Sequence, residues 1–574
     1  MMYYIYMKIC CLNHSNGTEI GTEAINLYAG SLYFYLRSFL DTVYPDNPVE
    51  WVDKIFTFDD YDQVIDRIIS SEPEFVLLSY HVWDSMHIDK IARGIREKNQ
   101  QIRFIGGGPS MDIKNKKSNF DNYPYLEAIF YGDGEEAFYE FIKRYEETGE
   151  ISDGINCATP HGDGYYKRFR FEEWEPYLTF TQPQLIDEFV KANAELKEKF
   201  GCNPQWMTET NRGCPYNCTF CDWNSGLHNK MSFKKLEIIK EEVTNFANSP
   251  ARDHMVLRTN DANFGQVKRD EEILDHYISN DLPIRISSWS KLQKVRTYQL
   301  MSKYNDYLDY TYKRIGLKAA KSSNISLQCI NKKSLEAIDR PEVDWHIHKD
   351  MIKEFAVSRE YGHSYLVADL ILDIPYMGYY EYIYQFCELY SAGFENLGFQ
   401  PWELLPNAPA NNLEYQQKYN LEIKPTLWIE TVIPEVNSIR EIDSKLRWEN
   451  SYSTDIIMEI GGESKRIFAY VIHSMYNTNP HMMKKLKYNL GKIFALSESI
   501  KKIIKKQEAI YGKQIWGIYQ PKIKTAFPMR GYLQEFMTKN PASRIKQENW
   551  NIPDLDKIMD LLDERFPDKI AINQ

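Results

Sequence analysis

The first 147 residues alternate between short apolar runs and longer stretches of helical periodicity. The apolar runs predict strands at Tyr6–Leu12, Phe75–Ser79, Ile102–Gly106 and Ala128–Tyr131. The amphipathic stretches predict helices at Ala24–Tyr44, Tyr61–Ser71 and Asp84–Lys98. Strands joined by such helices form a parallel, doubly wound sheet whose ligands bind at the carboxyl ends of the strands. We therefore expect residues 1–147 to form a Rossmann-like α/β domain.

A second series of strands and helices follows a connecting segment at residues 148–200. Its predicted strands are Trp206–Glu209, Met255–Thr259, Ile284–Ser288, Asn324–Gln328, Tyr365–Leu372 and Asn396–Gln400. This succession suits a partial (β/α)6 barrel of the TIM type over residues 201–415, with its chemistry at the carboxyl ends of the strands. The alternation of strands and helices stops after residue 415, and we expect residues 416–574 to form a mainly helical C-terminal domain. The predicted fold class is α/β.

Length and composition narrow the class of protein. A chain of 574 residues with 43% hydrophobic residues is too long for one core and is typical of a multidomain globular protein. The net charge of −12 has the wrong sign for gripping phosphates, so we expect no nucleic-acid partner. The chain has no apolar run of about 18 residues, which predicts no membrane span. Its nine cysteines are too sparse for a disulfide framework, which indicates a reducing, cytoplasmic location.

Cys214, Cys218 and Cys221 lie in the segment TNRGCPYNCTFCDW, directly after the first predicted barrel strand. Three thiolates at C-x3-C-x2-C spacing can hold three irons of a [4Fe–4S] cluster and leave the fourth iron open to another ligand. A structural zinc ion would instead require four protein ligands, and Cys202 or His228 is available as the fourth. The spacing favours the cluster and keeps zinc as the alternative.

This cysteine motif, with an aromatic residue before its last cysteine, resembles that of the radical S-adenosylmethionine (SAM) superfamily. In that family SAM chelates the open iron, and an electron from the cluster cleaves it to methionine and a 5′-deoxyadenosyl radical. The radical takes hydrogen from an unactivated C–H bond. The resemblance therefore implies an enzyme whose cofactors are a [4Fe–4S] cluster and SAM.

The resemblance also implies which residues contact SAM, although it indicates no catalytic side chain. They come from separate stretches: Asp261 and Asn263 for the ammonium group, Ser326, Gln328 and Arg340 for the carboxylate or ribose, and Phe220 and Gln400 for adenine. Strand alternation places Ser326 and Gln328 on one face. The segment DLILDIPYMG resembles the family's fifth strand and turn, but Asp373 and Tyr376 stand where the family has glycines. Close approach of the backbone to adenine is therefore not expected at that turn.

The amino-terminal segment resembles the cobalamin-binding-type domain of one branch of this superfamily, through LLSYHVW, IGGGP and YGDGEE. Glycines after a strand let a large planar ligand approach the backbone. The resemblance implies that Ser79, Gly106, Gly107 and Gly108 lie at a cobalamin site. The D-x-H-x-x-G motif with a cobalt-ligating histidine is absent, so no protein ligand to cobalt is expected.

Two kinds of reaction can follow hydrogen abstraction by the 5′-deoxyadenosyl radical. With cobalamin, the resemblance implies methylation of a substrate carbon. Without it, the same hydrogen abstraction ends in epimerisation or oxidation. A non-catalytic, metal-stabilised binding protein is the alternative of another class. By analogy we expect a peptide or natural-product intermediate as the substrate and an external electron donor such as flavodoxin or ferredoxin.

Overall fold

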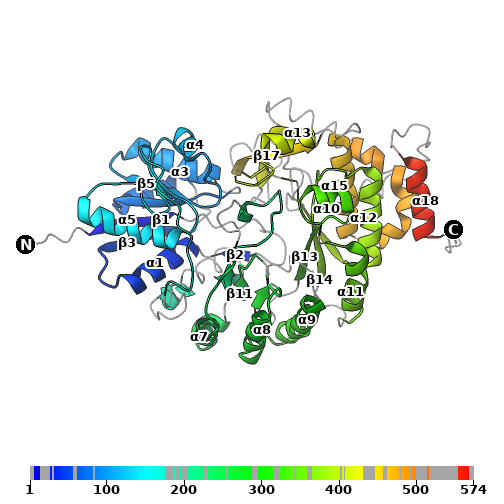
Figure 1. The fold of residues 1–574 in the computed structure, drawn as a ribbon, viewed down its shortest axis with the longest axis horizontal. Coiled ribbons are helices and arrows are strands. Elements are labelled where there is room, and N and C mark those ends of the chain that lie inside the picture. The colour runs from blue at the N-terminus through cyan, green and yellow to red at the C-terminus, as the bar shows by residue number, and fades with distance from the viewer. Residues whose placement is uncertain are drawn as a thin grey trace, which may run out of the picture.

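The computed structural model describes residues 6–12, 26–28, 31–55, 61–81, 85–174, 185–188, 190–191, 194, 203–224, 230–253, 256–262, 264–282, 284–286, 295–315, 322–341, 343–358, 365–400, 402, 404–405, 407–430, 447–456, 462–478, 480–491, 493–498, 514–515 and 554–567. Figure 1 shows an amino-terminal domain at one end, barrel strands in the middle and carboxyl-terminal helices at the other end. The barrel strands therefore lie between the amino-terminal domain and the carboxyl-terminal helices, while β17 (Arg447–Ile456) lies above the barrel strands in this view.

The amino-terminal domain is built on a six-stranded sheet in the order β3-β1-β4-β5-β6-β7. Its strands are β1 (Met7–Leu12), β3 (Val49–Ile55), β4 (Phe75–Ser79), β5 (Arg103–Gly107), β6 (Leu126–Phe130) and β7 (Cys157–Ala158). All pairings are parallel except that of β6 with β7. All five residues of β4 are buried, as expected for a central strand covered on both faces.

Helices cover both faces of this sheet. They are α1 (Ser31–Val43), α2 (Tyr61–Ser70), α3 (Ser85–Lys98), α4 (Lys116–Asn122) and α5 (Gly134–Thr148). Helix α1 packs beside α5, and α2 beside α3. Cys11 points into the core under α1 and α5, whereas its neighbour Cys10 points into the core under α2 and α3. The domain is thus doubly wound, as the alternating pattern predicts.

One predicted helix was wrong at its amino-terminal end. Asn26–Tyr28 lies inside the helix expected at Ala24–Tyr44, but these residues form strand β2, and the helix begins at Ser31. Strand β2 pairs in parallel with β8 (Asn203–Thr208), the first predicted strand of the barrel. The amino-terminal segment therefore extends the sheet that carries the cysteine loop.

The barrel region contains the six predicted strands. They are β8, β11 (Val256–Thr259), β12 (Ile284–Ile286), β13 (Ser322–Gln328), β14 (Tyr365–Ile371) and β15 (Asn396–Gln400). The described pairings form two parallel sheets, one in the order β12-β11-β8-β2 and one in the order β13-β14-β15. The six βα units thus confirm the predicted partial barrel.

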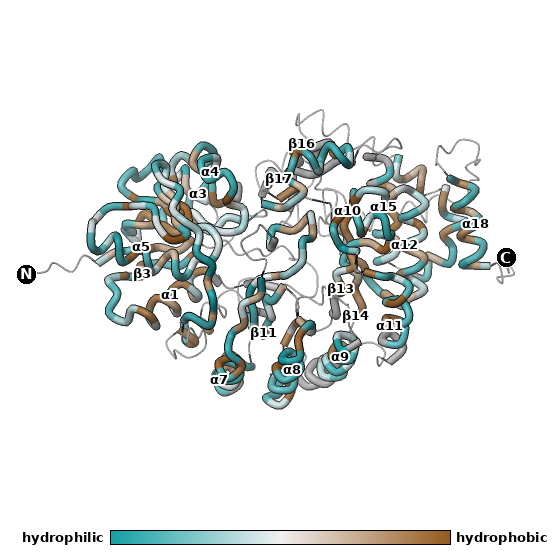
Figure 2. Tube along the Cα trace, in the orientation of Figure 1, coloured by the Kyte–Doolittle hydropathy of each residue, from teal (hydrophilic) through white to brown (hydrophobic). Residues whose placement is uncertain are grey.

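The outer layer of the barrel consists of helices α7 (Leu236–Ala247), α8 (Arg269–Ser279), α9 (Val295–Ile315), α10 (Lys332–Ala337), α11 (Trp345–Ser358) and α12 (Tyr379–Ser391). Figure 2 shows hydrophobic and hydrophilic positions interleaved along α7 and α8. Buried side chains of both helices join the main core with those of the strands. These helices therefore present one apolar side inward, as surface helices do.

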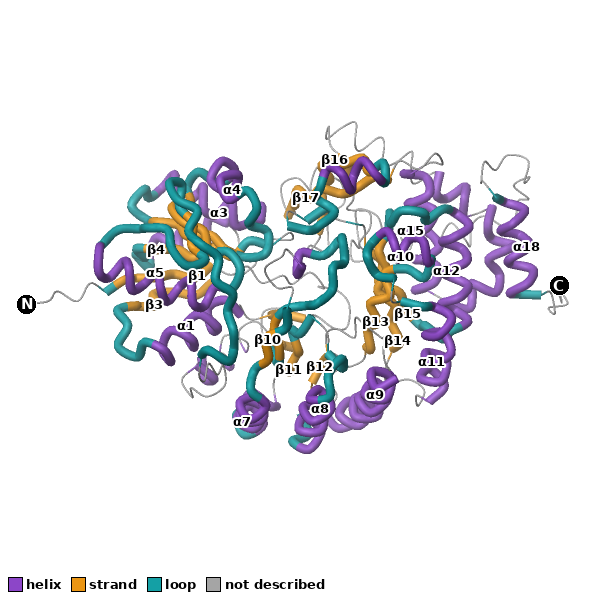
Figure 3. The backbone as a smooth tube through the Cα atoms, in the orientation of Figure 1, coloured by secondary structure: helices purple, strands orange, loops and turns teal. Residues whose placement is uncertain are grey.

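The carboxyl-terminal region contains a sheet that the sequence pattern did not predict. Strands β16 (Leu421–Glu430) and β17 (Arg447–Ile456) pair antiparallel, and β18 (Gln514–Ile515) joins β16. Figure 3 shows β16 and β17 apart from the helical layer, with α15 (Gly462–Thr478) and α18 (Leu555–Arg565) at the far end. The domain is therefore mixed rather than simply helical. Strand β17 also packs beside α3, which links both ends of the chain.

Among the described residues, no helix is both long enough and apolar enough to cross a membrane.

Candidate functional site

The cysteine loop leaves the carboxyl end of β8 and makes a short antiparallel ladder before the cysteines. Strand β9 (Asn211–Arg212) pairs with β10 (Ser232–Phe233). Cys218 is buried, and Cys214 and Cys221 are partly exposed. The Cys221 N–H donates to the Cys218 carbonyl at 3.1 Å, which closes a turn between these two residues. The loop therefore gathers the three thiols at the carboxyl end of a barrel strand.

The three thiols are close enough to influence one another. Burial is the main reason that the pKa of Cys221 is raised to about 12, and the nearby Cys218 and Cys214 contribute to this rise. Such a thiol stays protonated at neutral pH until a metal ion supplies the positive charge that favours its thiolate. The donor set thus fits a metal centre that all three thiols would share.

A single zinc ion and an iron–sulfur cluster place different demands on these three thiols. The C-x3-C-x2-C motif favours the cluster. A tetrahedral zinc ion with bonds of about 2.3 Å draws its thiolates within roughly 4 Å of one another. In an iron–sulfur cluster each cysteine binds a different iron, so the sulfurs stand further apart. Cys202 and His228, the proposed fourth zinc ligands, lie outside the described residues.

The second half of the cysteine loop is held by the barrel. The Thr219 N–H donates to the Ile338 carbonyl at 3.1 Å, and the Thr219 carbonyl accepts from the Ala410 N–H at 2.8 Å. One residue past Cys221, an Asp222 oxygen accepts from the Asn407 N–H at 3.0 Å. Burial raises the pKa of Asp222 to about 7, although the Asn407 N–H opposes this shift. These contacts attach the segment around Cys218 and Cys221 to the strand exits of the barrel.

Asp261 lies below the same loop, after β11, and is buried. Its Oδ1 accepts from the backbone N–H groups of Thr210 and Asn211 at 2.7 and 3.0 Å, and its Oδ2 accepts from the Thr210 hydroxyl at 2.9 Å. Burial raises the pKa of Asp261 to about 7 despite these donors. Asp261 therefore orients the turn that leads into the cysteine loop. Its contact with SAM stays a prediction, and Asn263 lies outside the described residues.

The residues predicted for the SAM carboxylate meet at the end of β13. Ser326 and Gln328 are both partly exposed between buried neighbours, which agrees with one shared face. Arg340 is only 2% exposed, and its Nη1 donates to the Ser326 carbonyl at 2.8 Å. A buried guanidinium beneath a strand end is not an ordinary surface arginine. Their contact with SAM stays a prediction.

The two residues predicted for adenine come from the cysteine loop and the last barrel strand. Phe220 is partly buried and packs against the main core. Gln400 is the last residue of β15, and its side chain lies outside the described part. Their contact with adenine also stays a prediction.

The turn after β14 keeps a glycine-like backbone without glycines. Asp373 has φ of 63° and Tyr376 has φ of 68°, which is the left-handed region that glycine adopts most readily. These are the two positions where the family pattern has glycine. The left-handed conformation is thus present at both positions although both residues carry a Cβ, and the expectation about adenine at this turn stays a prediction.

A cavity of about 240 Å³ lies between the cysteine loop and the amino-terminal sheet. Its walls come from the turns after β5 and β6, the segment around the cysteines, and one barrel exit. They are Gly108, Pro109, Met111, Ile113, Gly132, Asp133, Glu209, Arg212, Gly213, Asp222, Trp223 and Asn407. The carboxyl edge of the amino-terminal sheet thus faces the cysteine loop.

The three glycines at this edge differ in how much space the surrounding protein leaves for a side chain. A Cβ on Gly108, which has φ of +97°, would stand 2.5 Å from the Tyr80 carbonyl, so packing within the protein requires glycine there. A Cβ on Gly107 would meet only ordinary contacts, the nearest at 3.5 Å. A Cβ on Gly106 would press on the Leu126 side chain at 3.0 Å.

The two side chains at this edge leave the cavity open. Ser79 is buried at the end of β4 and is paired in register with Gly107. Tyr80 turns away from the cavity, and its hydroxyl lies 2.8 Å from that of Tyr125. The edge is therefore not filled by the Tyr80 ring.

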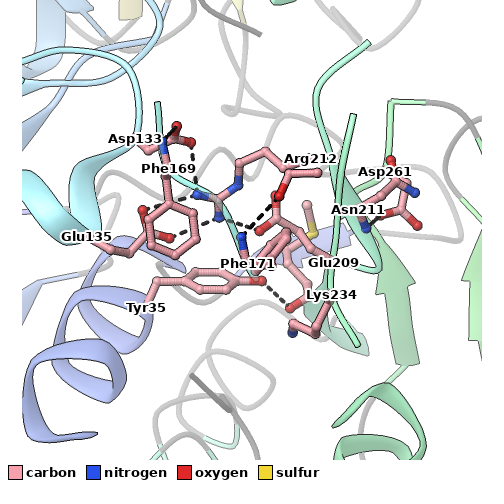
Figure 4. A network of polar contacts seen from close by, with 12 residues as sticks. Tyr35, Asp133, Glu135, Phe169, Phe171, Glu209, Asn211, Arg212, Lys234 and Asp261 are labelled. Carbon is pink, nitrogen blue, oxygen red and sulfur yellow. Dashed lines mark hydrogen bonds and ion pairs between the residues drawn. The ribbon is translucent and has the colours of Figure 1, made fainter. Parts of the chain in front are cut away.

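Arg212 is a residue of the site that the sequence patterns did not single out. Its guanidinium contacts Asp133 at 2.9 Å, Glu135 at 2.9 Å and Glu209 at 2.6 Å (Figure 4). Burial would lower the pKa of Arg212, but the three carboxylates hold it well above its ordinary value. The signals in the sequence are its place two residues before Cys214 and the nearby Glu209, because Asp133 and Glu135 are distant in the chain.

The fold and the cysteine loop are similar to those of radical SAM proteins with an amino-terminal cobalamin-binding-type domain. No protein-family model matches the chain. Its sequence is 26% identical, over 362 residues, to the 2-(S-pantetheinyl)-carbapenam-3-carboxylate methyltransferase of Streptantibioticus cattleyicolor, covering 62% of this chain and 50% of the relative. It is 25% identical, over 386 residues, to the cobalamin-dependent radical SAM methyltransferase TokK of Streptomyces tokunonensis, covering 66% and 53%.

Solved structures share the fold. OxsB, a cobalamin-dependent SAM radical enzyme solved with aqua-cobalamin and SAM, matches with a TM-score of 0.56 and 12% identity, over 98% of this chain and 84% of that chain. The radical SAM methyltransferase TsrM of Kitasatospora setae matches with a TM-score of 0.52 and 14% identity, over 74% and 79%. Its sequence relatives and structural neighbours include cobalamin-dependent radical SAM enzymes, which matches the expected resemblance to the branch that carries the cobalamin-binding-type domain. It spans about half the length of the curated relatives it matches.

Proposed function

We propose that this chain binds a [4Fe–4S] cluster through Cys214, Cys218 and Cys221, cleaves SAM reductively and abstracts hydrogen from a substrate carbon for cobalamin-dependent methylation. The observation that carries this proposal is the cavity shared by the cysteine loop and the carboxyl edge of the amino-terminal sheet. Methyl transfer requires that a cofactor on that sheet can reach a substrate near the cluster. Sequence relatives that are methyltransferases support the same reaction.

In this proposal the bound cofactors would supply the reactive groups, and residues of the chain would hold the site in position. When bound, the cluster would supply an electron to SAM, and cobalamin would supply the methyl group. The buried Asp261 orients the turn before the cysteines, and Arg340 supports the end of β13 from below. Both groups are held in place before any ligand arrives, which lowers the cost of orienting the reactants.

The substrate and the electron donor belong to the proposal as classes. One relative is named for a pantetheinyl carbapenam carboxylate, so we propose a small-molecule natural-product intermediate as the substrate here. We also propose an external electron donor of the flavodoxin or ferredoxin type.

Epimerisation by a thiol hydrogen donor has less support. Cys329 and Cys387 are both fully buried, and burial raises the pKa of each to about 12. A thiol enclosed in the core cannot reach a substrate radical in a cavity. Cys202, another cysteine outside the cluster motif, lies outside the described residues.

The cluster assignment is tested by single replacements of Cys214, Cys218 and Cys221 with alanine. Each variant should lose iron after anaerobic reconstitution and should no longer form 5′-deoxyadenosine, because two thiolates hold a cluster weakly. Cys329→Ala is the matched control, since Cys329 is buried elsewhere. Retained deoxyadenosine formation in any loop variant would refute the ligand set.

The cobalamin site is tested by filling the cavity from Ile113, which lines it. Ile113→Trp should lower cobalamin retention several-fold at unchanged iron content, whereas Ile113→Leu should not, because only the larger side chain occupies the cavity. Equal retention in both variants would remove cobalamin from this cavity and leave the cluster assignment standing.

A further inference from the structure

The cysteine loop is attached to both domains, and the direct ion pairs to the amino-terminal domain come from the segment before Cys214. The segment around Cys218 and Cys221 is bonded to the barrel through Thr219 and Asp222. The segment before Cys214 is bonded through Arg212 to Asp133 and Glu135, which follow strand β6 of the amino-terminal sheet. The metal-binding loop therefore spans the boundary between the two domains.

The contacts of Arg212 are unusually complete. Nη1 donates to Asp133 Oδ1 at 2.9 Å and to Glu135 Oε2 at 3.2 Å, while Nη2 donates to Glu135 Oε1 at 2.9 Å. The paired bonds to Glu135 form the planar fork that arginine makes with a carboxylate. Nη2 also donates at 2.6 Å to Oε2 of Glu209, which lies in the same segment, three residues before Arg212. The guanidinium thus has one fixed orientation.

Burial strengthens this arrangement. The side chain of Arg212 is 14% exposed, and those of Asp133 and Glu135 are 4% and 7% exposed. The rings of Phe169 and Phe171 lie 5.2 Å from the guanidinium carbon and exclude water from it. Figure 4 shows Asp133, Glu135 and Phe169 on one side of Arg212, facing the loop. Charge-assisted bonds in such surroundings are worth more than the same bonds at a surface.

The strand below the loop is held in the same way. Strand β2 pairs with β8, and the Tyr35 hydroxyl of α1 donates to the Met207 carbonyl in β8 at 2.8 Å. The approach to Cys214 is therefore held by the barrel, through Asp261, and also by the amino-terminal domain, through β2, Tyr35 and Arg212.

We infer that Arg212 is a positioning residue through which the amino-terminal domain holds Cys214 in place for the cluster. The inference rests on the proposed function, because it concerns a ligand of the proposed cluster. It goes further in assigning the amino-terminal domain a second role, that of completing the cysteine loop.

The test measures each cysteine separately in the full-length, metal-free chain. Pulsed alkylation with iodoacetamide, read by peptide mass spectrometry, gives the modification rates of Cys214 and Cys221. In Arg212→Gln the ratio of the Cys214 rate to the Cys221 rate should rise about tenfold over the unmodified protein, because only the Cys214 side loses its attachment. The reciprocal variant, Asp222→Ala, should move the ratio the opposite way.

Two variants separate positioning from general instability. Lys234→Met breaks another buried ion pair of the same region, in which Lys234 contacts Glu242 at 2.9 Å, and should leave the ratio unchanged. Glu135→Ala weakens the attachment from the amino-terminal domain alone and should raise the ratio as well. If Arg212→Gln does not fold, Glu135→Ala decides the question by the same measurement.

The outcomes are distinct from those for the proposed function. A ratio that stays unchanged in folded Arg212→Gln or Glu135→Ala, or that rises equally in Lys234→Met, overturns the inference. Because the metal-free chain is used, this result does not depend on deoxyadenosine formation. A chain that never forms deoxyadenosine but shows the shifted ratio would refute the proposed function and keep the inference.

Discussion

Replacing Asp261 with asparagine should change how the stability of this protein depends on pH. Asp261 is buried, and two of its three bonds converge on Oδ1, which accepts from the Thr210 and Asn211 N–H groups. Asparagine can keep those bonds with its carbonyl oxygen. Its amide group would face the Thr210 hydroxyl, which can accept a hydrogen bond as well as donate one. The variant therefore removes the charge with little change in shape.

The magnitude follows from the pKa of Asp261, which burial raises from 3.8 to about 7. Between these values the folded chain keeps a proton that the unfolded chain has lost, so the free energy of unfolding falls as the pH rises. A shift of this size corresponds to roughly 4 kcal/mol by pH 8. The asparagine variant lacks this loss. Its stability relative to the unmodified protein should therefore rise by about 2 to 4 kcal/mol between pH 5 and pH 8.

The assay is urea unfolding of the metal-free chain at pH 5, 6.5 and 8, followed by tryptophan fluorescence. Asp270, whose pKa burial raises to about 6, changes the absolute curves in the same direction but is present in both proteins. The difference between the two proteins therefore reports Asp261. Parallel curves would show that Asp261 is already ionised at pH 5 and would refute the reasoning.

Two further predictions concern the other turns of the site. Tyr376 has φ of 68° and is 43% exposed, so Tyr376→Gly should be more stable than Tyr376→Ala by about 1 kcal/mol, because both variants lose the ring but only alanine keeps a Cβ in the left-handed region. Equal unfolding free energies would contradict this. Gln328→Ala should weaken SAM binding several-fold at full iron content, as measured by anaerobic calorimetry, whereas Lys332→Ala on the exposed start of α10 should not. Unchanged affinity in Gln328→Ala would show that the predicted SAM site is misplaced.

The sequence alone determined those features that depend on neighbouring residues. Strands β4 and β15 have the predicted bounds, since β4 is a short apolar run and β15 alternates apolar Leu397 and Phe399 with other residues. The cysteine loop was also predictable, because its ligand spacing lies within one short segment. The order of the domains was predicted from where the alternation of strand-like and helix-like segments starts and stops along the chain.

Tertiary structure decided the features that join distant segments. Asn26–Tyr28 becomes a strand because β8, far along the chain, offers it a pairing edge, and no local pattern records that partner. Strands β16 and β17 likewise stabilise each other across residues that lie outside the described part. Arg212 meets Asp133 from 79 positions away, so its role in the site emerges only when the two domains are folded together. Local patterns specify elements and ligand spacing, whereas pairing edges and buried charge partners depend on contacts that only the folded chain brings together.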